Sequence, residues 1–340
     1  MVQSPSASRD IPEGGRCLSR LPKADLHLHL EGAMRPETLA DLSDAHGEPT
    51  PQLGNYSSFD QFQCCYRAVV KMIRTRTDLR RLVREVVEDA ALSGAVWVEP
   101  HFNPTTYAPT LGSVDEVLDL VLETGHAAGE TLGVGFGLTL SASRNRDPRH
   151  ATNLARLAVK YASHGVVALG LAGDERAGSA EAFKDAFTIA REAGIIVAPH
   201  SGELAGGATL RNTLDALAPD RIAHGVRAIE DQALLKRLAD AQITLDICLT
   251  SNRALGVVKH IKEHPLPRLL ESGVRCSLGS DDPLLLGTSL LAEYRLARSQ
   301  LALTDSQLAA LARASIQSSG APDHVLTPAL HGIDAWLGGR

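Results

Sequence analysis

Short apolar runs alternate along this chain with amphipathic helical patterns, and this alternation constrains the fold more than any other feature. Eight runs are typical of β-strands, at residues 24–30, 96–102, 134–142, 166–173, 195–200, 221–225, 243–248 and 274–282. Several are apolar at nearly every position, as parallel strands covered by helices are. Strands that each lead into a helix predict an α/β fold, here a (β/α)8 TIM barrel. A doubly wound open sheet shows the same alternation and is the alternative.

The helices between these runs have recognisable start signals. We expect one helix to begin at Thr77, because a stripe of leucine and valine follows it. Ser113 with Glu116, and Thr304 with Gln307, have the spacing of capping boxes, in which each residue satisfies a backbone N–H of the other.

Two stretches outside this alternation predict extra helices. One is the segment 57–76 in the long connection after the first strand, and the other is the helical tail beyond residue 290. We expect segment 57–76 to cover the mouth of the barrel and exclude water, as lids on barrels do. The 340 residues contain no internal linker. The sequence therefore predicts a disordered N-terminal tail at 1–19 and a single domain at 20–340.

Charge and cysteine content exclude several classes of protein. A net charge of −6 and an isoelectric point near 6.1 argue against a nucleic-acid partner bound through a basic surface. No apolar run reaches the length of about 18 residues that a membrane span needs, and the N-terminus lacks the apolar core of a signal peptide. The five cysteines are odd in number and contain no C-x-x-C, which favours a reduced, cytoplasmic protein. The oligomeric state has no signal in the sequence.

The stretch KADLHLHLEG, residues 23–32, alternates histidines and acids with leucine. Successive side chains of a strand point to opposite faces, so Asp25, His27, His29 and Glu31 share one face and the leucines share the other. Two neutral imidazoles on one face can bind the same metal ion. For this motif alone, a half-buried strand with its polar residues in water is the alternative.

Ionisable residues also follow other predicted strands. His200 ends the fifth strand with Glu203 just after it, His224 ends the sixth, and Asp281 and Asp282 end the eighth. In a (β/α)8 barrel the carboxyl ends of all strands surround one mouth, where reacting groups lie. Three imidazoles and one carboxylate at this mouth suit one zinc ion per chain, with a position left for water. The candidate ligands are His27, His29, His200 and Asp281.

The remaining histidines do not need a metal to explain them. His101 ends the second predicted strand, and its place, in the pocket or in the packing, stays open. The others are assigned to solvent or to local hydrogen bonds: His46, His126, His150, His164, His260, His264, His324 and His331.

Six motifs occur in order between residues 21 and 283: LPKADLHLHLEG, LAGDE, HSGE, RIAHG, the TSN after Cys248, and GSDDP. Together they resemble the adenosine deaminase family, a branch of the amidohydrolase superfamily. The resemblance implies a zinc-dependent hydrolase that acts on a cyclic amidine C–N bond. Such an enzyme converts a 6-aminopurine to the 6-oxo product and ammonia, so its expected partner is a small purine substrate.

The resemblance also implies a role for each candidate residue. The implied zinc ligands are His27, His29, His200 and Asp281. Glu203 would protonate the purine nitrogen N1, and His224 would orient and deprotonate the attacking water. Asp282 would bond to N7, the backbone N–H of Gly173 would meet N3, and Glu31 would contact the sugar.

Two positions bear on the exact substrate. Glu31 stands where adenosine enzymes usually have aspartate and resembles the adenine-specific branch, yet Leu284–Leu286 replace the aromatic residues that this branch has after SDDP. The chain also resembles the aminodeoxyfutalosine deaminases, which act on a nucleoside with an aryl carboxylate at the 5′ position. We therefore expect adenosine or a 5′-modified analogue such as 6-amino-6-deoxyfutalosine, with Leu284–Leu286 near an aryl group and Arg67 or Arg144 near a carboxylate. Free adenine is the alternative substrate.

Two other functions match part of this pattern. A metal hydrolase of the same fold could act on a lactone, an amide or a phosphoester, but it would not need the ring-nitrogen acid implied for Glu203. A binding protein that kept the barrel would not need a metal ion with an open position. Release of ammonia from a 6-aminopurine separates a deaminase from both.

Overall fold

The computed structural model describes residues 15–339, and its centre is a ring of parallel strands. Eight strands follow one another around the ring in chain order. They are β1 (Lys23–His29), β2 (Ala95–Phe102), β4 (Leu138–Ser143), β5 (Val166–Ala172), β6 (Ile196–Ser201), β7 (Arg221–His224), β8 (Thr244–Ile247) and β9 (Arg275–Leu278). The short β3 (Gly135–Phe136) pairs with β2 and is separated from β4 by Gly137, so the predicted run 134–142 forms two strands.

The first and last strands close the ring. Leu28 and Asp281 form a parallel bridge. In this bridge the N–H of His29 donates to the carbonyl of Asp281 at 2.7 Å, and the N–H of Asp281 donates to the carbonyl of His27 at 2.8 Å. A doubly wound sheet would leave two free edges. The bridge therefore confirms the (β/α)8 barrel, and it is made by the segments that carry three of the predicted metal ligands.

An outer layer of helices covers the strands. The helices that lead from one strand to the next are α3 (Arg76–Leu92), α5 (Val114–Leu132), α6 (Pro148–Tyr161), α7 (Lys184–Glu192), α8 (Gly207–Leu217), α9 (Gln232–Asp240) and α11 (Leu266–Glu271). After β9 the chain forms α12 (Pro283–Leu286), α13 (Leu290–Leu301), α14 (Asp305–Gln317) and α15 (Asp323–Gly338). Helix α14 packs on β1 and β9, so it covers the place where the ring closes.

The start of α3 differs from the prediction. Its cap is Thr75, whose side chain accepts from the N–H of Asp78, while the Asp78 carboxylate accepts from the N–H of Thr75. Thr77 cannot form such a box, because the third residue after it is Arg80, which has no acceptor. The two predicted capping boxes are confirmed at the starts of α5 and α14: Ser113–Glu116 and Thr304–Gln307.

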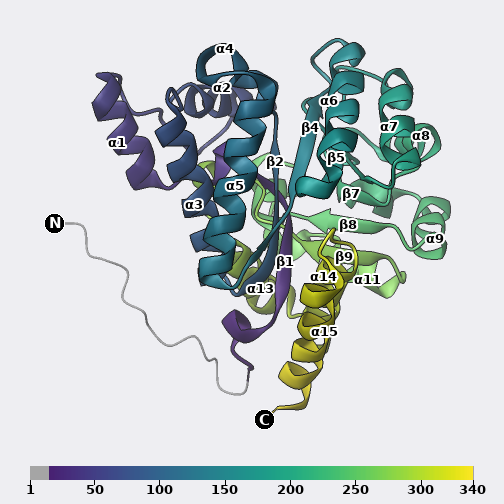
Figure 1. Ribbon diagram of the computed structural model, residues 1–340. Helices are drawn as coiled ribbons and strands as arrows, with labels where there is room; N and C mark the ends of the chain where they lie inside the picture. The colour runs from purple at the N-terminus through teal and green to yellow at the C-terminus, as the bar shows by residue number, and fades with distance from the viewer. Residues whose placement is uncertain (1–14, 340) are drawn as a thin grey trace.

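The extra helices lie after β1 and at the C-terminus, as predicted. Between β1 and β2 the chain forms α1 (Pro36–His46) and α2 (Phe59–Val70), the second within the predicted segment 57–76. In Figure 1, α2 and α4 (Ala108–Leu111) lie at the upper end of the molecule, and α15 extends toward the lower end. The upper end is the one toward which β1 runs, where the site residues follow the strands.

The predicted tail at 1–19 lies outside the described residues except for its last five. Within these five, the carbonyl of Cys17 accepts a hydrogen bond of 2.8 Å from the indole of Trp336 on α15. Leu18–Arg20 form a short 3-10 helix. In the described part of the chain, contacts with the domain thus begin before residue 20. None of the helices in residues 15–339 is long and apolar enough to cross a membrane.

Candidate active site

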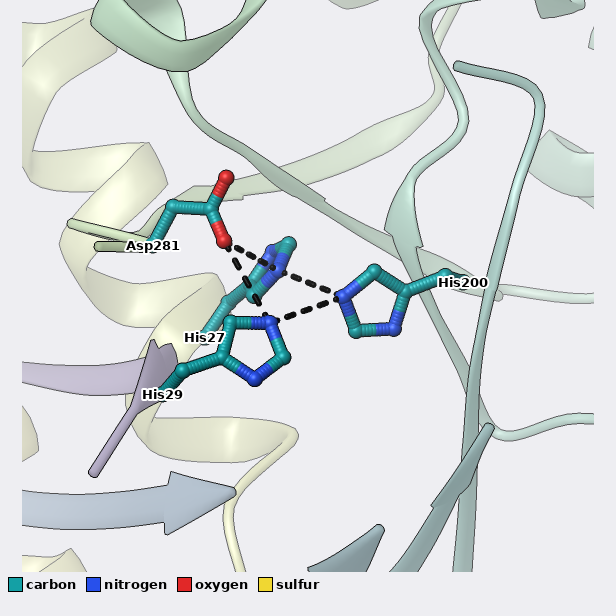
Figure 2. Close-up of side chains that lie close together, drawn as sticks. All are labelled: His27, His29, His200 and Asp281. Atoms are coloured by element: carbon teal, nitrogen blue, oxygen red, sulfur yellow. Dashed lines mark hydrogen bonds and ion pairs between the residues drawn. The ribbon is translucent and has the colours of Figure 1, made fainter. Parts of the chain in front are cut away.

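The four predicted metal ligands converge at the carboxyl end of the strands (Figure 2). Nε2 of His200 lies 3.1 Å from Nε2 of His27 and 3.3 Å from Nε2 of His29. Oδ1 of Asp281 lies 3.4 Å from both of the latter nitrogens. Two nitrogens held at about 2.0–2.1 Å from one tetrahedral zinc ion would be roughly 3.3–3.4 Å apart. The spacing of these atoms fits a tetrahedral ion.

The ring of His27 is oriented for this role by the backbone. Its Nδ1 lies 3.2 Å from the carbonyl oxygen of Asp246. Because a carbonyl oxygen can only accept, the proton of the neutral ring is on Nδ1, and Nε2 keeps its lone pair. Metal-binding histidines are held in the same way by a hydrogen bond on the far nitrogen.

The electrostatics of the four groups favour a bound cation. Burial lowers the pKa of His29 to about 4 and lowers that of His200 well below its ordinary value, so both rings are neutral. Burial alone would raise the pKa of Asp281, but His27 beside it holds that pKa well below its ordinary value. Burial would lower the pKa of His27, but the charges of Asp281 and Asp246 raise it, so a metal ion bound here would take the place of a proton on this ring.

A cavity of about 440 Å³ opens beside the four ligands. The predicted site residues that line it are His29, Glu31, Gly173, His200, Glu203, His224, Asp281 and Asp282. Helix α2 forms one wall through Phe59, Phe62, Gln63, Tyr66, Arg67 and Val70. The predicted cover is therefore at the mouth of the barrel, and its exclusion of water stays a prediction.

Glu203 and His224 lie next to each other in the wall of this cavity. Nε2 of His224 is 3.4 Å from Oε2 of Glu203 and 4.0 Å from Oδ2 of Asp281. Burial, with the charges of Asp281 and Glu175, raises the pKa of Glu203 well above its ordinary value. Burial lowers the pKa of His224 to about 3. Burial thus favours the protonated acid at Glu203 and the neutral imidazole at His224.

The loop that carries Glu203 is held by a second carboxylate. Glu175 accepts from three successive backbone N–H groups, those of Gly202 at 2.9 Å, Glu203 at 2.7 Å and Leu204 at 3.2 Å. Arg227 donates to the carbonyl of Glu203 at 2.9 Å. These bonds fix the backbone on both sides of the residue, so its carboxyl is positioned before a ligand arrives.

Asp282 and Gly173, two of the predicted purine contacts, both line the cavity. Oδ1 of Asp282 is buried and has no partner within the described residues. Burial and the charge of Asp281 raise the pKa of Asp282 well above its ordinary value, so its carboxyl can donate. Gly173 has a φ of +92°, and a Cβ there would lie 2.5 Å from Oδ1 of Asn145, so the position requires glycine. A Cβ on Gly32 would meet Oδ1 of Asp282 at 1.8 Å, so this glycine makes room for the carboxyl.

Glu31 is held by two tyrosines that the sequence analysis did not identify. Tyr66 of α2 donates to Oε2 at 2.9 Å, and Tyr107 donates to Oε1 at 2.9 Å. Burial raises the pKa of Glu31. Each oxygen can still accept one more hydrogen bond from a ligand. The bond from Tyr66 also joins α2 to the barrel beside the metal ligands.

The structure resolves the place of His101 and shows the partners of both ring nitrogens of His264. His101, which was open, lines the cavity with its ring centroid 5.2 Å from that of His29. His264 is 3% exposed, and its Nδ1 makes a local hydrogen bond, as assigned, by accepting from the N–H of Leu266 at 3.1 Å. Its Nε2 has a more distant partner and lies 3.0 Å from Oδ1 of Asn252 on α10 (Leu249–Ala254). Its local sequence, HIKEHP, gives no sign of this, since its partner belongs to another element.

Of the side chains expected near a 5′ substituent of the substrate, the structure places some at the cavity and others away from it. Leu284–Leu286 form α12 and do not line the cavity, which corrects the expectation that they meet an aryl group. Arg144 is buried and donates to the carbonyls of Gly178 at 3.1 Å and His200 at 3.0 Å, so it supports the site from outside the cavity. Arg67 lines the cavity and is exposed, so it alone of this group can meet a ligand.

Comparison with known proteins bears on the activity of this site. The sequence model of the adenosine deaminase family matches residues 22–336. A protein from Streptomyces virginiae with the provisional name adenosine/adenine deaminase is 46% identical over 96% of this chain and 100% of its own length. Adenine deaminase from Rhizobium leguminosarum bv. trifolii is 35% identical over 88% of this chain and 94% of its own.

Two further relatives differ in the substrate that their names give. Aminodeoxyfutalosine deaminase from Acidothermus cellulolyticus is 34% identical over 82% of both chains. The solved structure of adenine deaminase from Arthrobacter aurescens superposes with a TM-score of 0.86 at 26% identity, and covers 94% of this chain and 99% of its own. The relatives thus share one type of reaction and divide between free base and nucleoside.

Proposed function

The chain belongs to the adenosine deaminase family of hydrolytic deaminases, and we propose that it uses one zinc ion to remove the 6-amino group of a purine nucleoside. One observation carries this proposal. Glu203, an acid whose pKa is raised, lies at the same cavity as three imidazoles and a carboxylate with the spacing of a tetrahedral metal site. A lactone, amide or phosphoester hydrolase needs the metal ligands but has no ring nitrogen for this acid to protonate.

The metal ligands in this proposal are His27, His29, His200 and Asp281. A bound zinc ion would lower the pKa of water from about 16 to about 7, which makes hydroxide available at neutral pH. His224 would orient the attacking oxygen, because its Nε2 lies 4.0 Å from Oδ2 of the ligand Asp281.

Glu203 would supply the proton that makes the ring accept electrons. Attack at C6 of an aminopurine places electron density on N1, and a proton delivered there gives a neutral tetrahedral intermediate. The proton of the new C6 hydroxyl then passes to the amino group, the C–N bond breaks to release ammonia, and the 6-oxo product remains. An ionised glutamate could not begin this sequence, so the raised pKa of Glu203 is what the step requires.

The other predicted residues would hold the purine in place. Asp282, with an unpartnered carboxyl oxygen, would bond to N7, and the backbone N–H of Gly173 would meet N3. Glu31, at the same cavity, would contact the sugar. Contacts at several edges of the ring would align C6 with the attacking oxygen.

The size of the cavity supports a nucleoside. At about 440 Å³ it falls within the usual range of about 300–1,000 Å³ for small-molecule sites, and a purine base alone would leave much of it empty. Arg67 lies at the mouth of the cavity, where its guanidinium could form an ion pair with an acidic 5′ substituent. Free adenine is the second candidate, because a carboxylate such as Glu31 can accept from the N9–H that only the free base has.

A substrate panel decides between the two. We would measure ammonia release and kcat/KM with adenine, adenosine, 2′-deoxyadenosine, 5′-modified adenosines and aminodeoxyfutalosine. The nucleoside proposal expects at least one nucleoside to exceed adenine. If adenine exceeds every nucleoside tenfold or more, a transition-state preference of about 1.4 kcal/mol, the protein is an adenine deaminase.

A further inference from the structure

A chain of directed hydrogen bonds runs from the start of α11 to the two proposed acid–base residues. It begins where the backbone N–H of Leu266 donates to Nδ1 of His264 at 3.1 Å. A ring nitrogen that accepts a hydrogen bond carries no proton, so the proton of neutral His264 is on Nε2. This N–H donates to Oδ1 of Asn252, 3.0 Å away. Burial, which lowers the pKa of His264 to about 3, keeps the ring neutral.

The bond from His264 settles the orientation of the Asn252 amide. With its oxygen turned to His264, Asn252 directs its NH₂ group to the opposite side. There Nδ2 lies 3.2 Å from Nδ1 of His224 and 3.3 Å from Oε1 of Glu203. The two amide hydrogens are thus divided between two residues. Asn252 is fully buried, so water cannot substitute for either bond.

This arrangement also decides where His224 carries its proton. Because Nδ1 accepts from Asn252, the proton of the neutral ring is on Nε2, the nitrogen that faces Oε2 of Glu203 and Oδ2 of Asp281. His224 therefore presents an N–H to the cavity. It can donate to the attacking oxygen and orient it, whereas removal of a proton from water would require the ring to exchange tautomers first.

We propose that His264 and Asn252 are positioning residues that set the tautomer of His224 and the orientation of the Glu203 carboxyl. The inference rests on the proposed function for its catalytic consequence, and on the hydrogen-bond chain alone for the tautomers. Neither residue lines the cavity. Their loss should therefore change turnover more than substrate binding.

The tautomers can be read without any substrate. In zinc-loaded protein with ¹⁵N-labelled histidine, long-range ¹H–¹⁵N spectra distinguish a protonated ring nitrogen from a bare one. Assignment uses the spectra of single His264 and His224 variants. We expect both residues to carry the proton on Nε2. A proton on Nδ1 of either residue would overturn the proposal, whatever reaction the protein catalyses.

Kinetics test the consequence. His264→Leu keeps an apolar side chain in the buried site but removes the donor to Asn252. It should lower kcat by roughly 10- to 100-fold, as the loss of other outer hydrogen-bond partners does, with little change in KM. His264→Gln, whose amide can donate to Oδ1 of Asn252, should restore most of kcat. His260→Leu is the matched control, because His260 is exposed and lies four residues earlier in the same loop.

Each outcome has a defined meaning. A wild-type kcat in His264→Leu, or a His264→Gln variant as slow as His264→Leu, would overturn the positioning role. Metal content and melting temperature are measured for every variant, and if His264→Leu does not fold, the spectra of the wild-type protein decide. A wild-type protein that releases no ammonia from any 6-aminopurine would contradict the proposed function and leave the tautomer test intact.

Discussion

At the scale of single residues, the two buried glutamates of this site, Glu31 and Glu203, have different hydrogen-bond partners and charged neighbours. Glu31 accepts from the hydroxyl groups of Tyr66 and Tyr107, so donors surround its carboxyl. Burial of Glu203 and the negative charges of Asp281 and Glu175 disfavour its ionised form, and they outweigh the hydrogen bond that it accepts from Asn252. The same side chain therefore suits substrate contact in one place and proton delivery in the other.

Glu203→Gln should keep the fold and the bound metal and lose turnover. The amide is nearly isosteric with the acid but cannot deliver a proton, and such groups contribute about 10²–10⁴-fold. The raised pKa predicts that wild-type turnover persists at pH values well above 4.5, the ordinary pKa of glutamic acid, and declines as pH rises through the raised value. Steady-state kinetics check both points, with exposed Glu192→Gln as control. A kcat equal to wild type would remove Glu203 from the mechanism.

Some residues of the site are predictable from sequence because a strand end fixes their place. His27 and His29 follow from the alternation of one strand, and Asp281 follows from the end of another. Tyr107 and His264 were not predicted, and Asn252 was noted only as part of the TSN motif, because their partners depend on how loops from different elements come together in space. No periodicity in a single segment records that kind of contact.

At the scale of elements, the sequence predicted strand positions better than local starts and interruptions. Each of the eight predicted runs overlaps one strand of the ring, whether the run is apolar on both faces or alternates as β1 does. The break at Gly137 was missed; a Cβ at this residue would lie 2.7 Å from the Trp97 ring, a tertiary contact that the run itself does not record. The start of α3 was misplaced because the prediction relied on the stripe of leucine and valine after Thr77. It overlooked the capping box that Thr75 and Asp78 form.

The corrected cap of α3 gives a stability prediction. Thr75→Ala removes the acceptor for the N–H of Asp78 and should lower the free energy of unfolding by about 1 kcal/mol. Thr77→Ala, two residues later in the same helix, keeps the cap and should cost much less. Chemical denaturation of both variants checks the difference. Equal losses would show that the box at Thr75 does not stabilise the start of the helix.

Helix α2 should move more readily than the helices around it. It buries only Phe62 and Val69 among its twelve residues, and Tyr66 joins it to Glu31 through one hydrogen bond. Segments with few buried contacts open at low free-energy cost. Amide exchange in 59–70 should be faster than in α9 and should slow when a non-hydrolysable purine nucleoside is bound. If the bound nucleoside leaves the amide exchange rate of 59–70 unchanged, α2 does not act as a cover of the cavity.

At the scale of the whole molecule, the proposed metal site and the closure of the barrel use the same chain segments. The bridge between Leu28 and Asp281 joins β1 to the end of β9. Asp25 adds to this seam by accepting from the hydroxyl of Ser280 at 2.6 Å. A metal ion held by His27, His29 and Asp281 would therefore connect the first and last strands of the ring.

Removal of the metal should destabilise the fold for this reason. An ion that binds only the folded state stabilises it by about 4 kcal/mol at a thousandfold excess over its Kd. A strong chelator should lower the melting temperature of the wild-type protein. The same chelator should have no effect on His27→Ala, which is expected to be purified without metal. If the chelator removes the metal from the wild-type protein without lowering its melting temperature, the metal site does not stabilise the closure of the barrel.

The central claim is that this barrel is a metal-dependent deaminase of a 6-aminopurine, and ammonia release tests it most directly. The protein would be compared in its zinc-loaded and metal-stripped forms, with ammonia and the 6-oxo product quantified together over the substrate panel. We predict equimolar ammonia and 6-oxopurine from at least one substrate, loss of both on stripping, and recovery when zinc is restored. Folded, zinc-loaded protein that releases no ammonia from any member of the panel would contradict the account.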